Sequence, residues 1–134
     1  MMRTGTRTSG QQQHHYTDDG EAVGKQIRKL HGLDFDVYPV KLGPGEYHVT
    51  RRRADVIITV LGSCVAACIR DPIACVGGMN HYMLPSSEDG VWGGGTRSTR
   101  FGNIAMDKLI EDIEAAGGHR DRLEVKLIGG ARMF

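Results

Sequence analysis

The stretch of sequence that decides the fold is VIITVLGSCVAACIRDPIACVGGMNHYMLP, residues 56–85. It begins with a continuous run rich in β-branched residues, Val56 to Val60, which is typical of a strand buried on both faces. Two further apolar runs follow, one on each side of Asp71-Pro72. Asp and Pro are favoured at the first two positions of a type I turn. We therefore predict an antiparallel hairpin whose loop is centred on Pro72 and Ile73.

The predicted hairpin brings a cysteine and a histidine together. Symmetry about its loop places Cys68 opposite Gly77 and, further from the loop, Cys64 opposite His81. Directly opposed residues have Cβ atoms about 4.5–5.5 Å apart, close enough for a thiol to hydrogen-bond an imidazole. The pairing depends on register, because a slip of one residue turns every side chain to the other face.

A cysteine beside a histidine is the pattern of a thiol nucleophile. An imidazolium favours the thiolate, which attacks an amide or ester carbonyl, and the imidazole then protonates the leaving group. Gly62 and Ser63 form a tight turn before Cys64, and such a turn frees backbone N–H groups to bind an oxyanion. A hydroxyl or amide usually orients the imidazole. Thr59, Ser63 and Asn80 are the nearby candidates, and the sequence does not choose among them.

The remaining cysteines are better explained by packing. Cys68 and Cys75 fall on the same face of the predicted hairpin, and most isolated buried cysteines are core residues. The chain has no Cys-x-x-Cys, and its cysteine spacings fit no structural zinc template. We therefore expect neither a metal nor another cofactor.

Composition describes an ordinary globular protein. The 134 residues suit a single domain, and 40% are apolar while 25% are charged. A net charge of +1 argues against a general attraction to nucleic acid. No apolar run approaches the roughly 18 residues of a membrane span, and the N-terminus lacks the apolar core of a secretory signal. We expect a cytoplasmic protein.

The pattern outside the hairpin predicts further elements. Residues 1–24 have little to bury and indicate a disordered tail, followed by an ordered domain over residues 25–134. A Gly-Pro turn precedes a strand that begins at Tyr47. Asn103 is a candidate cap for a helix that Gly117-Gly118 ends, and residues 123–128 alternate like a half-exposed strand. The basic run Arg51–Arg53 is either a solvated loop or a docking patch for an acidic partner.

Several short motifs occur in a fixed order along the chain: GPGE at 43–46, LGSCVA at 61–66, DP at 71–72, GGMNHYMLP at 77–85, FGNIAM at 101–106 and GGARMF at 129–134. Together they resemble the motifs of the CheD family of chemoreceptor glutamine deamidases. The resemblance runs from about residue 38 to the end of the sequence. The order and separation of these motifs make the signal far more specific than a lone short motif.

The resemblance implies a deamidase that converts glutamines of methyl-accepting chemotaxis receptors to glutamate and releases ammonia. It also implies hydrolysis of receptor methyl esters and regulation by a CheC-type phosphatase. The family's nucleophile falls on Cys64 and its histidine on His81, and Thr59 is the nearby threonine for its third catalytic position. The implied fold is α+β, a layered sandwich of mixed β-sheets with flanking helices and the active site at a β-hairpin.

Family members usually continue beyond the GGARMF segment, so the resemblance implies a domain that is truncated at its C-terminus. This feature favours an alternative function: a non-catalytic adaptor that binds chemoreceptor helices or a CheC-type phosphatase.

Overall fold

The computed structural model describes residues 18–83 and 98–132. Their elements are α1 (Asp18–His31), β1 (Tyr38–Leu42), β2 (Tyr47–Thr50), β3 (Asp55–Thr59), β4 (Val65–Asp71), β5 (Val76–Asn80), α2 (Gly102–Ala115), the 3-10 turn η1 (Arg120–Arg122) and β6 (Glu124–Gly129). Strands β1 and β3 form a parallel pair, and an antiparallel sheet has the order β2-β5-β4-β6. This part of the chain is therefore α+β with mixed strand pairing, as predicted. None of its helices has the length and apolar character to cross a membrane.

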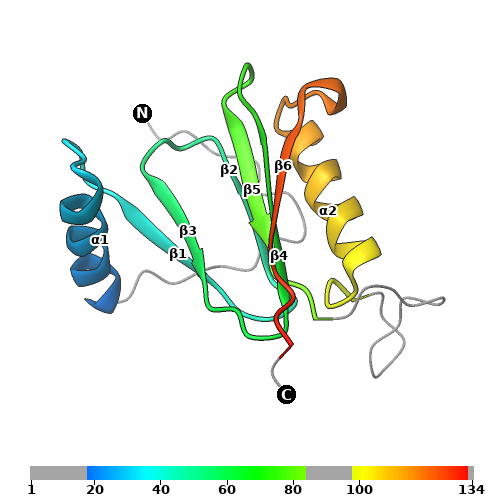
Figure 1. The fold of residues 1–134 in the computed structure, drawn as a ribbon. Helices are drawn as coiled ribbons and strands as arrows, with labels where there is room; N and C mark the ends of the chain where they lie inside the picture. Colours follow the sequence, from blue (N-terminus) through cyan, green and yellow to red (C-terminus); the bar gives the residue numbers. More distant parts are fainter. Residues whose placement is uncertain (1–17, 84–97, 133–134) are drawn as a thin grey trace.

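The four-stranded sheet separates the two helices (Figure 1). Helix α2 packs against one face of this sheet, over β2, β4 and β5. The β1–β3 pair lies on the other side of the sheet, and α1 packs against β1 beyond it. His81, which directly follows β5, contacts Thr59 of β3 and so faces the β1–β3 side of the sheet.

Alternation along β4 builds a core on both faces of the sheet. Successive side chains of a strand point to opposite faces. Ala67 and Ile69 pack toward α2, where they meet Leu109. Ala66 and the half-buried Cys68 pack toward β1 and β3. A strand covered on both sides needs an apolar residue at almost every position, which explains the unbroken apolar run that begins β4.

The β4–β5 hairpin forms with a register different from the predicted one. Cys68 pairs with Met79 rather than with Gly77, so the prediction was wrong by two residues. The loop has four residues, because the carboxylate of Asp71 accepts the N–H groups of its second and third residues. Its last residue, Cys75, takes a left-handed φ of 52°. A shift of two residues preserves the face on which each side chain lies.

The turn before β2 and the end of α2 follow the sequence prediction. Gly45 and Gly117 have φ values of 81° and 102°, which favour glycine. The prediction that Asn103 caps the helix was wrong. Phe101, buried and extended, is the N-cap residue, and its carbonyl accepts the N–H of Ala105 at 2.8 Å. Asn103 lies inside the first turn and is exposed.

The two ends of the described chain also differ from expectation. Helix α1 begins at Asp18, so residues 18–24, which belong to the predicted tail, are helical, and this part of the prediction was wrong. Residues 1–17 of the predicted tail lie outside the described residues. Strand β6 is exposed along its whole length rather than half-exposed, since it lies at the edge of the sheet beside β4.

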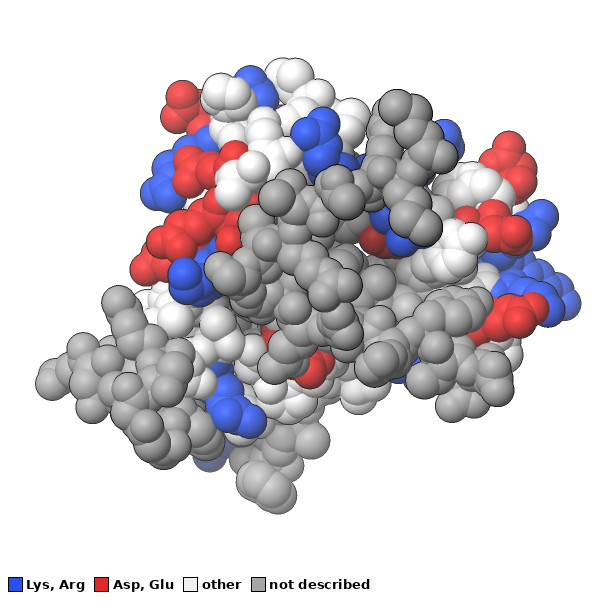
Figure 2. Space-filling model, turned by 180° about the vertical axis from the view of Figure 1, so that it is seen from behind, with Lys and Arg blue, Asp and Glu red and all other residues white. Residues whose placement is uncertain are grey.

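The basic run before β3 is engaged within the chain. Arg51 donates hydrogen bonds to the carbonyls of Ala116 and Ala74, which ties the end of α2 to the hairpin loop. The two arginines that follow stack over aromatic rings, Arg52 over Tyr38 and Arg53 over Phe35. In Figure 2 acidic and basic side chains are interspersed on the visible face. These contacts favour a structural role over a docking patch for an acidic partner.

Gly78 controls how closely α2 approaches the sheet. A Cβ atom there would lie 2.5 Å from the His48 carbonyl oxygen and 2.8 Å from Leu109 Cδ1. We expect Gly78→Ala to destabilise the fold by about 1–3 kcal/mol, as overpacked cores usually do. Denaturant unfolding of this variant beside Gly77→Ala, whose nearest contact is 3.1 Å, measures the effect. Equal stability of Gly78→Ala and wild type would contradict this close packing.

Candidate functional site

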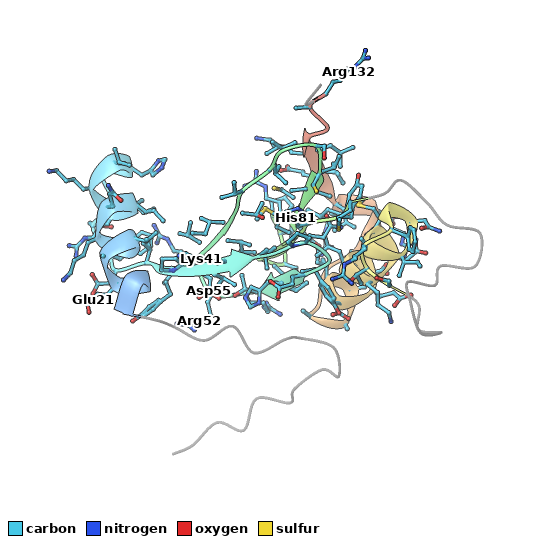
Figure 3. The ribbon with its side chains drawn as sticks, turned by 90° about the horizontal axis from the view of Figure 1, so that it is seen from below. Glu21, Lys41, Arg52, Asp55, His81 and Arg132 are labelled. Carbon is cyan, nitrogen blue, oxygen red and sulfur yellow. The ribbon has the colours of Figure 1, made fainter. Side chains whose placement is uncertain are left out.

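The main chain of His81 is fixed by the turn that precedes β2. His81 N–H donates to the Glu46 carbonyl at 3.0 Å, and the His81 carbonyl accepts the Gly45 N–H at 2.7 Å. The His81 residue is only 3% exposed, and it lies near the middle of the molecule (Figure 3). The Gly-Pro-Gly-Glu motif therefore positions the histidine, although the two are far apart in sequence.

The imidazole of His81 is oriented by Thr59, the last residue of β3. Thr59 Oγ1 lies 2.8 Å from His81 Nδ1 and 2.7 Å from the Leu42 carbonyl oxygen. A carbonyl can only accept, so the single hydroxyl proton of Thr59 goes to Leu42. The hydrogen-bond network then assigns a proton to Nδ1, which donates to Thr59. The other ring nitrogen, Nε2, keeps its lone pair.

His81 Nε2 is the chemically available end of this chain of hydrogen bonds. It is buried, and it has no hydrogen-bond partner among residues 18–83 and 98–132. Leaving a buried polar atom unpaired costs about 1–3 kcal/mol, so such atoms are rare unless they serve a function. An imidazole held at Nδ1 and open at Nε2 is arranged to accept and return a proton.

Of the three residues that could orient the imidazole, the structure brings Thr59 to it. Asn80 faces α2 instead: its Oδ1 accepts the Ala67 N–H at 2.9 Å, and its Nδ2 lies 3.6 Å from Met106 Sδ. Ser63 is exposed, in the turn after β3. Asn80 therefore joins the sheet to α2, one residue before His81.

Cys64 lies on the same face of the sheet as His81 but diagonal to it. Val65 and Tyr82 form an antiparallel bridge, with N···O distances of 3.0 and 2.9 Å. Cys64 directly precedes Val65, and His81 directly precedes Tyr82. Because successive side chains alternate between faces, those of Cys64 and His81 lie on the face opposite to Val65 and Tyr82. Diagonal neighbours on one face lie about 7–8 Å apart, with their Cβ atoms somewhat closer, which is still within reach of aromatic and long side chains. The prediction that Cys64 lies directly opposite His81 was wrong, because the hairpin register differs by two residues from the predicted one.

The turn that leads into Cys64 offers backbone donors. The N–H groups of Gly62, Ser63 and Cys64 donate no hydrogen bond to another residue in the described part of the chain. Cys64 is half-buried, and its thiol is free. Unpaired N–H groups beside a thiol form the kind of donor set that stabilises an oxyanion. Among the described residues, no three His, Cys, Asp or Glu side chains gather as a metal site would require.

Two contributors to the site were missed in the sequence. The Leu42 carbonyl fixes the tautomer through Thr59, and Glu46 places a negative charge near His81. Glu46 Oε2 accepts the N–H of Gly43 at 2.7 Å, which holds the turn closed. The Gly-Pro-Gly-Glu motif was visible in the sequence, but its contact with the histidine depends on the pairing of β2 with β5.

Burial lowers the pKa of His81 below its ordinary 6.5, and the Leu42 carbonyl and the Glu46 carboxylate partly oppose this effect. We expect an NMR titration to find the imidazole neutral at pH 7, with a midpoint below 6.5. The unfolded chain takes up the proton at a higher pH. The stability that the neutral imidazole contributes is therefore present above pH 6.5 and is lost as the pH falls below it. Glu46→Gln should lower the midpoint further, and a midpoint above 6.5 in the wild type would contradict this environment.

Comparisons with known proteins point to one family. Residues 83–134 match the family model described as CheD, chemotactic sensory transduction. Over 108 residues, the chain is 50% identical to a protein of Rhodopseudomonas palustris strain BisA53 named "Probable chemoreceptor glutamine deamidase CheD", a match that covers 81% of the chain and 51% of the relative. Two further relatives carry the same name. The chain is 49% identical to the one from Halorhodospira halophila, over 81% of the chain and 51% of the relative, and 52% identical to the one from Caulobacter vibrioides NA1000, over 71% of the chain and 50% of the relative. The predicted resemblance to the CheD family is therefore confirmed. The chain spans about half the length of these relatives.

Proposed function

We propose, from the likeness to CheD proteins and from the geometry around His81, that this chain carries the catalytic site of a cysteine-dependent protein-glutamine deamidase. Its substrates are glutamine side chains of methyl-accepting chemotaxis receptors. The observation that carries the proposal is the Leu42–Thr59–His81 chain of hydrogen bonds, which leaves the buried Nε2 without a partner among the described residues, on the face that also holds Cys64.

In the first half of the reaction, His81 Nε2 takes the proton of the Cys64 thiol. The thiolate attacks the carboxamide carbon of the glutamine, and the N–H groups of Gly62 and Ser63 stabilise the oxyanion. The carbon–nitrogen bond then breaks. The nitrogen takes the proton from His81 and departs as ammonia, leaving a glutamyl thioester on Cys64.

Water completes the reaction. Neutral His81 accepts a proton from water at Nε2, and the resulting hydroxide attacks the thioester carbonyl. The carbon–sulfur bond breaks, glutamate is released, and the proton returns to the Cys64 sulfur. Thr59 keeps Nδ1 as a donor throughout, so both proton transfers use the same ring nitrogen. The same steps hydrolyse a glutamyl methyl ester, with methanol as the leaving group.

The proposal extends to setting and partners. We place the reaction in the cytoplasm, where thiols stay reduced, and all three cysteines are free in the structure. We propose a CheC-type phosphatase as a regulatory partner, on the family likeness alone. The arrangement of α1, the β1–β3 pair, the four-stranded sheet and α2 supports a layered sandwich with the active site at the β4–β5 hairpin.

A deamidation assay tests the proposal. The chain is incubated with a chemoreceptor cytoplasmic fragment, and the digested peptides are weighed. We expect a gain of about one mass unit at specific glutamines, as an amide becomes an acid. The gain should vanish in Cys64→Ala and persist in Cys75→Ser, which removes an exposed thiol. Binding of the fragment with no mass gain, unaffected by Cys64→Ala, would favour the adaptor function instead.

A further inference from the structure

The end of β6 lies directly against the backbone of Cys64. Val65 pairs with Gly129 in the β4–β6 register, and the N–H of Gly130 donates to the Cys64 carbonyl at 2.9 Å. Gly129 and Gly130 have φ values of 108° and 76°, a conformation that side chains with a Cβ rarely adopt. This turn away from the sheet aims the Gly130 N–H at Cys64.

Gly129 is required by space as well as by its backbone conformation. A Cβ atom there would overlap the Cys64 carbonyl oxygen and would come within 3.1 Å of Leu61 Cδ1. Leu61 and Cys64 bound the turn that holds the candidate oxyanion donors. The absence of a side chain at Gly129 therefore lets β6 approach this turn, and no larger residue fits without displacing it.

Cys64 is consequently held from two sides. On the β6 side its carbonyl accepts from Gly130, and on the β5 side the next residue, Val65, forms two hydrogen bonds with Tyr82. The Tyr82 contact fixes the segment after β5 in which His81 lies, whereas the Gly130 contact fixes the end of the turn that carries the Cys64 thiol. Arg132, two residues beyond Gly130, lies well away from His81 (Figure 3).

We propose that Gly129 and Gly130 are positioning residues, which hold the main chain of Cys64 so that its thiol is presented to His81 Nε2. This inference rests on the proposed role of Cys64 as nucleophile. Neither glycine touches the substrate. Both act through the Cys64 carbonyl, and an error of about 1 Å in the placement of a reacting group can cost 10²-fold in rate.

The test measures the reactivity of Cys64 separately from turnover. The wild-type chain and its variants are treated with limiting iodoacetamide at pH 7, and alkylation of each cysteine is followed by peptide mass spectrometry. Exposed Cys75 serves as the internal reference, and half-buried Cys68 reports unfolding. In Gly129→Ala we expect the ratio of Cys64 to Cys75 alkylation to fall at least about tenfold while Cys68 stays slow. In the deamidation assay kcat should fall by a similar factor, with KM within about twofold.

Gly32→Ala is the matched control. Gly32 also has a positive φ, 60°, but a Cβ atom there would meet none of the described residues within 4 Å. Gly32→Ala therefore introduces the same kind of backbone strain without a contact to the turn at Cys64. The ratio of Cys64 to Cys75 alkylation in this variant should equal that of the wild type. An unchanged ratio in folded Gly129→Ala would overturn the proposal, and a fall of equal size in Gly32→Ala would do so as well.

Fast alkylation of Cys68 would show that Gly129→Ala does not fold. In that case Gly130→Ala provides a second test of the proposal. Among the described residues, a Cβ atom at Gly130 would meet only Val65 Cγ2, at 3.7 Å, so this variant mainly disturbs the φ that directs the Gly130 N–H toward Cys64. We expect an intermediate fall in the Cys64 ratio, and no fall would overturn the proposal. Alkylation needs no receptor, so it tests the positioning role separately from the proposed function. If the wild-type chain showed no deamidase activity but the ratio of Cys64 to Cys75 alkylation still fell in the glycine variants, the proposed function would be wrong and the positioning role would be supported.

Discussion

Replacing His81 with asparagine is expected to lower the rate of glutamine deamidation by about 10³-fold, within the range that general acid–base catalysis usually contributes. The variant removes Nε2, the ring nitrogen that is buried without a partner in the described part of the chain. Without it, neither the thiol proton nor the proton required by departing ammonia has a carrier. The measurement is kcat/KM for mass gain at receptor glutamines.

Two comparisons separate this loss from a general effect of the substitution. His119 is an exposed histidine, so His119→Gln should retain activity within about twofold. In a Cys64→Ala background, His81→Asn should cause no further loss, because residues that act as one unit are strongly non-additive. A full additional loss in the double variant would mean that His81 acts independently of Cys64.

The Asp71→Asn variant is expected to show the largest loss of stability. The Asp71 side chain is fully buried and accepts hydrogen bonds from two loop N–H groups, from the His119 N–H and from the guanidinium of Arg122, at 2.7 Å. Removing its charge leaves Arg122 without its partner. We expect Tm to fall by roughly 10 °C, as for other broken buried ion pairs. Asp34→Asn, at an exposed carboxylate, should leave Tm within a few degrees.

Acid should reveal the same interaction without mutation. The Arg122 guanidinium holds the pKa of Asp71 well below its ordinary 3.8, and the hydrogen bonds from Ala74, His119 and Ile73 add to the effect. Because the pKa is lower in the folded chain than in the unfolded one, the stability it contributes is present above about pH 4 and is lost as the pH falls further. In Asp71→Asn, stability should depend less on pH below about pH 4 than it does in the wild type. An equal acid dependence in wild type and variant would contradict the role of Asp71.

The sequence predicted the secondary-structure elements around the site better than it predicted their pairing register and contacts. Periodicity and turn residues placed the β4–β5 hairpin, the strand after the Gly-Pro turn and the end of α2 correctly, because these depend on neighbours in the chain. The register failed because the four-residue loop is set by the Asp71 side chain, and Asp-Pro alone does not specify how many residues follow. The helix start failed because Phe101 caps α2 through its buried position, which tertiary packing determines.

Residue patterns alone left three candidates for the residue that orients His81, and only the family resemblance pointed to Thr59, which the structure places 2.8 Å from Nδ1. Thr59 meets the histidine only because β3 lies across the face of the four-stranded sheet. Asn80, the last residue of β5, directly precedes His81 and therefore points to the opposite face. Strand alternation would have excluded Asn80 once His81 was assigned to a face. The contact of β6 with Cys64 was beyond prediction, since it joins residues more than sixty positions apart.

The most direct test of the account is to capture the covalent intermediate. The chain is mixed with a chemoreceptor fragment, quenched in acid within the first turnover, and the peptide that contains Cys64 is weighed. We expect a thioester adduct on Cys64 whose added mass equals that of the substrate peptide less ammonia. This adduct should be absent in Cys64→Ala and should accumulate when hydrolysis is slowed. Deamidation that proceeds in Cys64→Ala at the wild-type rate, with no adduct in either protein, would contradict it.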